Sequence, residues 1–321
     1  MHIPDGFLSL PPASATVAAS VSALWVALRR LRLGMPRRKI PLMGVTAAFL
    51  FTAQMLNFPV AGGTSGHLLG SVLAAILLGP SAAVVVMTAV LVVQCLLFAD
   101  GGVVALGANV FNMAVVAVLG GFVVFRGMSR LLPGQRGFLA ATAFGSWCST
   151  VFASIFCAAE LAWSGVAPWR TVFPAMAGVH MLVGLGEGLI TTLVVVAIRR
   201  TRPELLELTA PSASPRPDRL ALAGGLVVTV GLLLFGLPLA SSWPDGLERV
   251  AEGLGFAERA VRRPVLPAPL ADYRLPGLGS ATVATCAAGF VGTVIVFLLA
   301  YGLAAALTPR AASEDGGAGK S

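Results

Sequence analysis

Nine long apolar runs, separated by short polar or basic segments, constrain this chain more than any other feature. About 20 consecutive apolar residues cross the roughly 30 Å hydrocarbon core of a bilayer. Charged residues make up only 11% of the chain, too few to cover a water-facing surface. We therefore expect an all-α polytopic membrane protein embedded in a lipid bilayer. The runs are residues 13–28, 40–58, 67–78, 81–98, 107–125, 137–163, 171–198, 220–239 and 280–307.

The runs fall into two groups, because a polar segment rich in Pro, Glu and Arg separates the first seven from the last two. This pattern predicts a seven-helix bundle followed by a two-helix module. The predicted units are residues 1–200, the seven-helix bundle; 201–219, a cytoplasmic linker; 220–308, the two-helix module with an external loop at 241–277; and 309–321, a disordered cytoplasmic tail.

Basic residues predict the orientation in the membrane. Arg and Lys gather at residues 29–39, 126–136 and 199–202, and the positive-inside rule places these segments in the cytoplasm. Alternation then puts the N-terminus outside and the C-terminus inside. The formal net charge of +8 is therefore explained by these cytoplasmic basic segments. Nucleic acid is not an expected partner, because the chain has no basic face interleaved with aromatic residues.

The chain begins Met1-His2, and these two residues carry three nitrogen donors. Because His2 is large, we expect Met1 to be retained with a free amine. The Met1 amine, the His2 amide nitrogen and the His2 Nδ1 atom can close two fused chelate rings around one ion. Such a planar set suits Cu(II) or Ni(II) better than tetrahedral Zn(II) and leaves one position open. Since the ligand nitrogens must lose protons, metal capture is expected to weaken as pH falls.

His67 is the best candidate for the fourth ligand among the three histidines of the chain. The predicted topology places it on the same side as His2. It follows a glycine-rich loop at 62–66, and irregular backbone is tolerated at membrane depth where it lines a cavity. Ser65 is predicted to cap a helix that His67 opens. The alternative is a hydrogen-bonded interfacial histidine.

Three further polar residues are candidates for orienting the imidazoles. Asn109 and Asn112 are about one helical turn apart and share a face of the predicted helix. Imidazole ligands usually donate their other N–H to a fixed acceptor, so these asparagines and Ser65 are predicted to lie around the ligands. Helix capping and interhelical hydrogen bonds are an equal alternative for the two asparagines.

A second function fits some of the same residues. Gly63-Thr64-Ser65-Gly66 matches the Gly-x-Ser-Gly pattern, and His180 could be its base, as in an intramembrane serine protease of the rhomboid type. Against this, His180 is predicted to lie about ten residues, roughly 15 Å, into its helix, while Ser65 lies at the outer mouth. At that depth His180 is expected to form a structural or gating network with Glu187.

The C-terminal residues 316–321 imitate a phosphate-binding loop without its context. Glu314 stands where the pattern requires a glycine, and no helix follows Ser321 to hold phosphates. Nucleotide binding is therefore not expected here.

Several long motifs together resemble the CbiM/NikM family of nickel and cobalt substrate-capture (S) components of energy-coupling factor (ECF) transporters. The resemblance covers about residues 1–200. It implies that a metal is bound by the Met1 amine, the His2 amide and imidazole, and the His67 imidazole. The motifs are Met-His-Ile-Pro-Asp-Gly-Phe-Leu at 1–8, Gly-Gly-Thr-Ser-Gly-His-Leu-Leu-Gly at 62–70, Ala-Leu-Gly-Ala-Asn-Val-Phe-Asn-Met at 105–113, and His180 with Gly-Leu-Gly-Glu-Gly at 184–188.

The rest of the chain resembles the small two-helix companion subunit of that family, fused here through the linker. Ser-Trp-Pro-Asp-Gly-Leu-Glu at 242–248 looks like the signature of its nickel/cobalt branch. The resemblance implies a transporter subunit of a bacterial or archaeal cell membrane, with no enzyme activity and no prosthetic group of its own. The implied partners are a transmembrane coupling (T) protein and two ATPases, and the implied cargo is Ni(II) or Co(II).

Overall fold

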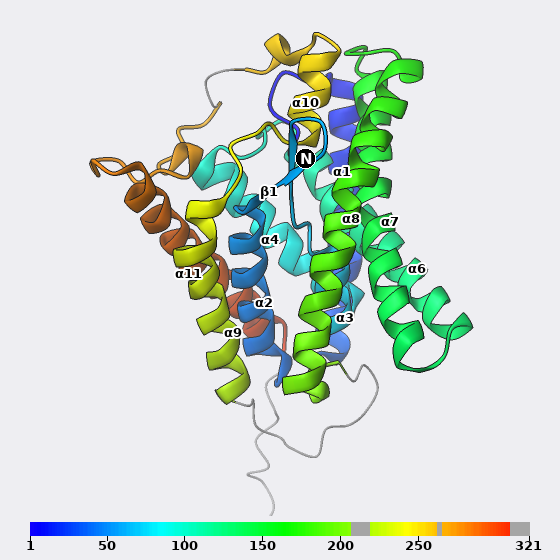
Figure 1. Ribbon diagram of the computed structural model, residues 1–321, viewed down its shortest axis with the longest axis vertical. Coiled ribbons are helices and arrows are strands. Elements are labelled where there is room, and N and C mark those ends of the chain that lie inside the picture. Colours follow the sequence, from blue (N-terminus) through cyan, green and yellow to red (C-terminus); the bar gives the residue numbers. More distant parts are fainter. Residues whose placement is uncertain (207–218, 262–264, 309–321) are drawn as a thin grey trace, which may run out of the picture.

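The computed structural model describes residues 1–206, 219–261 and 265–308, which form a bundle of roughly parallel helices (Figure 1). Seven helices of this described part are long and apolar enough to cross a membrane, which confirms the predicted all-α polytopic membrane protein. The predicted tail and most of the predicted linker lie outside the described residues. The seven are α1 (Leu10–Gly34), α4 (Pro80–Phe98), the continuous helix Leu106–Leu131, α7 (Gly134–Trp163), α8 (Trp169–Thr201), the helix Leu222–Leu239 and α11 (Ala281–Leu307).

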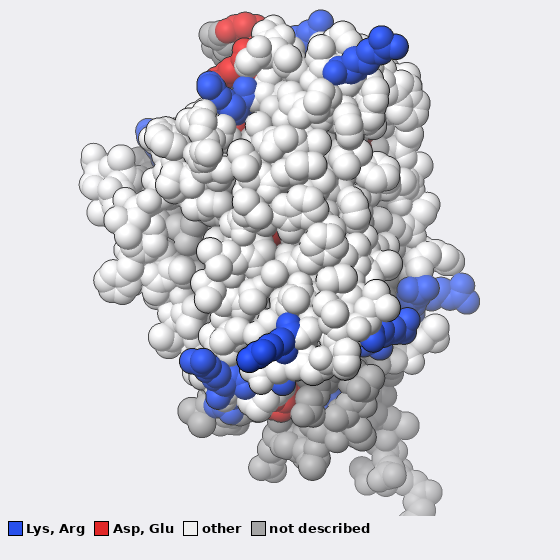
Figure 2. All heavy atoms as spheres, turned by 45° about the vertical axis from the view of Figure 1, so that its right-hand side comes forward, with Lys and Arg blue, Asp and Glu red and all other residues white. Residues whose placement is uncertain are grey.

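A broad band of uncharged side chains covers the face of the bundle seen in Figure 2, and Lys and Arg gather toward its two ends. On α8, Leu185, Leu189 and Leu193 are 63%, 61% and 58% exposed and recur every fourth residue, so they share one face. An apolar surface of this extent is stable against lipid tails rather than water. The chain is therefore a multi-pass membrane protein.

Two helices are shorter than their apolar runs, because a β-hairpin interrupts them. Gly62 and Gly63, both with positive φ, turn the chain between antiparallel strands in which Asn57 pairs with His67. Main-chain groups on the outer edges of the hairpin bond to residues 241–244: the Ser241 N–H donates to the Asn57 carbonyl and the Ser65 N–H to the Pro244 carbonyl, each at 2.8 Å. Irregular backbone inside a membrane bundle requires such partners. The elements are α2 (Lys39–Gln54), β1 (Asn57–Val60), β2 (Thr64–His67) and α3 (Ser71–Leu78).

The prediction that Ser65 caps a helix opened by His67 is wrong. Both residues lie in β2, and α3 begins only after Gly70, whose φ of 72° is the left-handed conformation that glycine adopts freely. Residues 67–78 are mostly apolar, so a helix was predicted to begin at His67 itself. Gly62 and Gly63 instead form the hairpin turn before β2, and Gly70 forms the turn that delays the start of α3.

The C-terminal helices pack directly on the N-terminal part of the bundle. The hydroxyl oxygens of Thr52 in α2 and Thr293 in α11 are 2.9 Å apart and buried. Gly292 allows α11 to approach Phe51 closely, because a Cβ atom there would lie 2.3 Å from the phenyl ring. A short helix, α10 (Gly246–Gly253), lies at the end of the bundle that holds the N-terminus (Figure 1). The remaining helical segments are α5 (Leu106–Asn109), η1 (Val110–Val116), α6 (Ala117–Leu131), η2 (Pro203–Leu205), α9 (Arg219–Gly231), η3 (Leu232–Gly236), η4 (Leu237–Leu239), η5 (Ala257–Arg259) and η6 (Ala271–Tyr273).

Candidate metal centre

The first residues of the chain are fixed inside the bundle by main-chain hydrogen bonds. Asn109 accepts a hydrogen bond from the Ile3 N–H (2.8 Å) and donates one to the Ile3 carbonyl (3.1 Å). The Gly102 N–H donates to the same carbonyl at 2.8 Å. Ile3 is completely buried. Asn109 therefore holds the main chain beside His2, whereas it was predicted to orient an imidazole.

Asn112 does not reach the candidate ligands. Its side-chain amide donates to Glu160 on α7 at 2.8 Å, within the buried bundle. The prediction that it orients His2 or His67 is therefore wrong, and its interhelical alternative is correct. Asn109 and Asn112 lie on either side of the start of the π-helical segment η1, whose wider turns separate residues that an α-helix would align.

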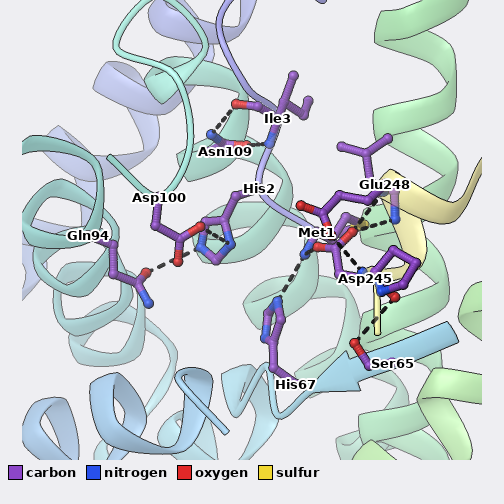
Figure 3. A network of polar contacts seen from close by, with 12 residues as sticks. Met1, His2, Ile3, Ser65, His67, Gln94, Asp100, Asn109, Asp245 and Glu248 are labelled. Carbon is purple, nitrogen blue, oxygen red and sulfur yellow. Dashed lines mark hydrogen bonds and ion pairs between the residues drawn. The ribbon is translucent and has the colours of Figure 1, made fainter. Parts of the chain in front are cut away.

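The Met1 amine lies between an imidazole and a carboxylate (Figure 3). Its nitrogen is 2.9 Å from Nε2 of His67 and 2.7 Å from Oδ2 of Asp245. Two nitrogens bound at right angles to one ion, each about 2.0 Å from it, are about 2.8 Å apart. The amine and the His67 imidazole therefore have the spacing of adjacent ligands of a single metal ion.

His67 presents an unprotonated nitrogen to the amine. Its Nδ1 atom is 3.3 Å from the carbonyl of Leu68, and a carbonyl only accepts hydrogen bonds, so Nδ1 carries the proton. Burial, followed by the positive charge of the Met1 amine, lowers the pKa of His67 well below its usual value. The neutral imidazole that results is the form that binds metals.

The His2 ring lies beside the His67 ring, but its nitrogens contact other side chains. The ring centroids are 5.4 Å apart and the planes differ by 27°. His2 Nε2 is 3.2 Å from Oε1 of Gln94, and Nδ1 is 3.2 Å from Oδ1 of Asp100. Burial lowers the pKa of His2, although the Asp100 charge opposes this shift. Binding of Nδ1 to an ion shared with Met1 and His67 requires Nδ1 to leave Asp100.

Asp245 joins the candidate site to α10. Its Oδ1 atom accepts hydrogen bonds from the N–H groups of Leu247 (2.8 Å) and Glu248 (2.9 Å), and the Glu248 carboxylate accepts from the Asp245 N–H. This reciprocal capping box leaves Oδ2 for the Met1 amine. Burial acts to raise the pKa of Asp245, but the charge and hydrogen bond of the amine lower it below its usual value. The aspartate is therefore an ionised partner of the amine.

Ser65 ties β2 to the same segment. Its main-chain N–H donates to the Pro244 carbonyl (2.8 Å), and its hydroxyl donates to the Trp243 carbonyl (2.6 Å). His180 Nδ1 donates to the Met176 carbonyl (2.8 Å) on its own helix. The two residues of the protease hypothesis are thus each bonded to main-chain carbonyls. Ser65 supports the strand that carries His67 and contacts neither imidazole.

Met1 and His67 border a small, partly open cavity of about 20 Å³, which has room for one water-sized particle, and His2 is not among its lining residues. His180 lines this cavity, so the expectation that it lies far below the site and pairs with Glu187 is wrong. The hairpin carries His67 down into the bundle to the level of His180. The lining consists of Met1, Gly66, His67, Leu69, Thr150, His180, Val183, Asp245 and Gly246.

Glu187 fixes the main chain that follows His67. Its buried carboxylate accepts hydrogen bonds from the N–H groups of Leu69 and Gly70. This arrangement anchors the turn between β2 and α3 to α8. Within the described ranges, no three His, Cys, Asp or Glu side chains are grouped to hold a metal ion.

Three contacts at the site involve side chains that were not predicted as site residues: Gln94, Asp100 and Asp245. A glutamine inside an apolar run is a functional signal by itself, because polar side chains at membrane depth are costly and face the bundle interior. Asp100 directly follows such a run and precedes two glycines. Asp245 belongs to the motif at 242–248, but its partner at the other end of the chain cannot be read from the motif.

Comparisons with known proteins place the chain among membrane proteins that transport transition metals. It is 39% identical to a protein of Archaeoglobus fulgidus named "Putative fused nickel transport protein NikMN", over 94% of this chain and 98% of that one. It is 32% identical to the "Cobalt transport protein CbiM" of Geobacter sulfurreducens, over 92% and 90% of the two chains. A crystal structure titled as a truncated transition metal transporter matches 63% of this chain and 99% of its own, with 34% identity and a TM-score of 0.57.

The family follows from matches to family models. Residues 2–205 match the CbiM model, described as "Cobalt uptake substrate-specific transmembrane region". Residues 219–309 match the PDGLE domain, and we call residues 219–308 the PDGLE segment. The chain belongs to the CbiM family of nickel and cobalt transport proteins, in the fused form that includes a PDGLE domain. It is a metal transport subunit rather than an enzyme.

Proposed function

We propose that this chain captures Ni(II) or Co(II) as the substrate-binding (S) component of an ATP-driven ECF transporter. The ion is held in a square plane by four nitrogens: the Met1 amine, the His2 amide nitrogen, His2 Nδ1 and His67 Nε2. The observation that carries this proposal is the 2.9 Å separation of the Met1 amine and His67 Nε2 beside a small cavity. Nickel is the favoured ion, because planar nitrogen ligation suits Ni(II).

In this proposal the end of the bundle that holds Met1 faces the outside of the cell. The basic segments at the opposite end face the cytoplasm, as does the C-terminus. Residues 1–200 form the metal-binding module and residues 220–308 a second module whose loop helps to load or release the ion. A T protein and two ATPases supply the energy that opens the site inward.

Metal analysis of the purified full chain with an intact N-terminus tests the function directly. The protein should bind close to one nickel ion per chain, and the bound Ni(II) should be diamagnetic, as expected of a square-planar low-spin site. Nickel loading should also be required for uptake by vesicles that contain the T protein and ATPases. A paramagnetic six-coordinate ion at full occupancy would contradict the planar site, and failure to bind either nickel or cobalt would contradict the function.

Gly66→Ala should weaken nickel binding severalfold through a steric effect on β2. A Cβ atom on Gly66 would lie 2.5 Å from Cγ1 of Val183 on α8, so the strand must shift away and carry His67 with it. Overpacking of this kind costs about 1–3 kcal/mol. Gly178→Ala, on α8 like Val183, is the control, because a Cβ atom at residue 178 would have no atom within 4 Å. Nickel titration should separate the two variants, and equal affinities would show that the spacing of β2 from α8 is unimportant.

A further inference from the structure

Asp100 connects the His2 imidazole to a tyrosine of the PDGLE segment. The Tyr273 hydroxyl donates a hydrogen bond to Oδ2 of Asp100 at 2.6 Å. The other carboxylate oxygen, Oδ1, is 3.2 Å from Nδ1 of His2. Each oxygen of this carboxylate therefore has its own partner. The Tyr273 side chain also hydrogen-bonds that of Gln94, which contacts the other nitrogen of the His2 ring. The phenol can therefore act on His2 through Asp100, which contacts Nδ1, and through Gln94.

Tyr273 is anchored on the end of α4 that carries Asp100. Its ring stacks on Phe98, with centroids 4.7 Å apart and planes at 23°, and it also approaches Phe51, with centroids 6.2 Å apart. Three residues earlier, the Leu270 N–H donates to the Leu97 carbonyl at 2.9 Å. These contacts fix the distance from the phenol to Asp100, which follows α4 by two residues.

The backbone at Tyr273 is held in a costly conformation. Asp272 has a φ of 54° and Tyr273 a φ of 56°, in the left-handed region that residues with a side chain rarely adopt. Such strain persists only where the surrounding structure imposes it, and it concentrates at functional sites. Here the strained turn brings the phenol to Asp100, and the stacking on Phe98 retains it there.

The contacts of His2 show which of its nitrogens Asp100 occupies. Nε2 is 3.2 Å from Gln94 Oε1, and Nδ1, the nitrogen that the proposed metal site uses, is 3.2 Å from Asp100 Oδ1. The direction in which Nδ1 points therefore depends on where Asp100 is held.

Resting on the proposed metal site, we propose that Tyr273 of the PDGLE segment is a positioning residue for the His2 ligand and acts through Asp100. The phenol occupies Oδ2 and keeps the carboxylate in one orientation, which in turn limits the rotation of the imidazole. Without the phenol hydroxyl, Asp100 turns and the His2 ring adopts several orientations. Because Nδ1 must leave Asp100 before it can bind the ion, nickel then captures the released imidazole faster.

The test compares Tyr273→Phe with Tyr301→Phe in the full chain. Phenylalanine keeps both aromatic rings, and these are the only two tyrosines of the protein. Tyr301 lies on α11 with 41% of its surface exposed. With imidazole ¹⁵N labels, the three histidines give a simple NMR spectrum. Before nickel is added, Tyr273→Phe should shift the ring signals of His2, and Tyr301→Phe should leave them unchanged.

The rate of nickel capture after rapid mixing is the second measurement. It should be about threefold to tenfold faster in Tyr273→Phe, below the 10–100-fold effect of groups that contact a metal ligand directly. In an Asp100→Asn background the same substitution should have a clearly smaller effect, because coupled residues give non-additive changes. An equal effect in both backgrounds, or His2 signals identical to those of Tyr301→Phe, would overturn the proposal. If His2 signals shift but the unsubstituted protein binds no nickel, the positioning role stands and the transport function fails.

Discussion

One alanine added before Met1 is expected to remove nearly all nickel from the purified protein. The addition converts the Met1 amine into an amide nitrogen and moves the new amine one residue away from His67. Groups that merely orient ligands change metal affinity by about 10–100-fold, so loss of a ligand should cost at least about 100-fold. We expect less than about a tenth of the chains to retain nickel after a desalting step.

The structure leaves little room to accommodate the added residue. Met1 is only 7% exposed, and its amine is within hydrogen-bonding distance of both His67 and Asp245. The adjoining cavity of about 20 Å³ has space for one water-sized particle, not for an amino acid. Because Asn109 and Gly102 hold Ile3, the segment cannot retreat to place a new amine at the old position.

Removal of the added alanine by an aminopeptidase provides the matched control. The trimmed protein has the original sequence and has passed through the same purification, so its nickel content should return to that of the unmodified protein. Equal nickel contents before and after trimming would contradict the amine as a ligand. Nickel content measured by mass spectrometry, with the N-terminus verified on the same sample, decides between these results.

The sequence predicts the helices well because the thickness of a bilayer determines the length of an apolar run. It also identifies three nitrogen donors in the first two residues, Met1 and His2, whose role as metal ligands stays a prediction. His67 could be selected because few histidines compete for the role. These predictions depend on short-range chemistry or on composition, which a single sequence contains.

The unpredicted features are long-range contacts and the fold of one apolar run. Asp245 lies 244 residues from Met1 and Tyr273 lies 173 residues from Asp100, and nothing in the spacing of these residues specifies that they meet. The hairpin was missed because its strands lie within or beside apolar runs that match a helix equally well. The hairpin also brings His67 beside the same cavity as His180. The prediction counted the depth of His180 along its helix but assumed that His67 lay at the outer mouth, so it placed the two residues too far apart.

Asp245→Asn is expected to weaken nickel binding by about tenfold to 100-fold, the range for groups that orient a metal ligand. The aspartate accepts a hydrogen bond from the Met1 amine through Oδ2, which directs the amine toward His67. A coordinated amine retains N–H groups that donate to this carboxylate, and the negative charge also favours a bound dication. Asparagine caps helices about as well as aspartate, so the hydrogen bonds to Leu247 and Glu248 should persist and α10 should remain folded.

Glu248→Gln distinguishes this contact from a general effect of charge. It removes the same unit charge three residues away, and glutamine preserves the capping box in which Glu248 accepts from the Asp245 N–H. Nickel titration should therefore give an affinity within about twofold of the unsubstituted protein for Glu248→Gln, against at least about 1.4 kcal/mol lost in Asp245→Asn. Equal losses in both variants would assign the effect to net charge. Unchanged binding in both variants would mean that Asp245 contacts the Met1 amine without helping it to bind nickel. A role of the PDGLE segment in nickel affinity through this contact would then be rejected.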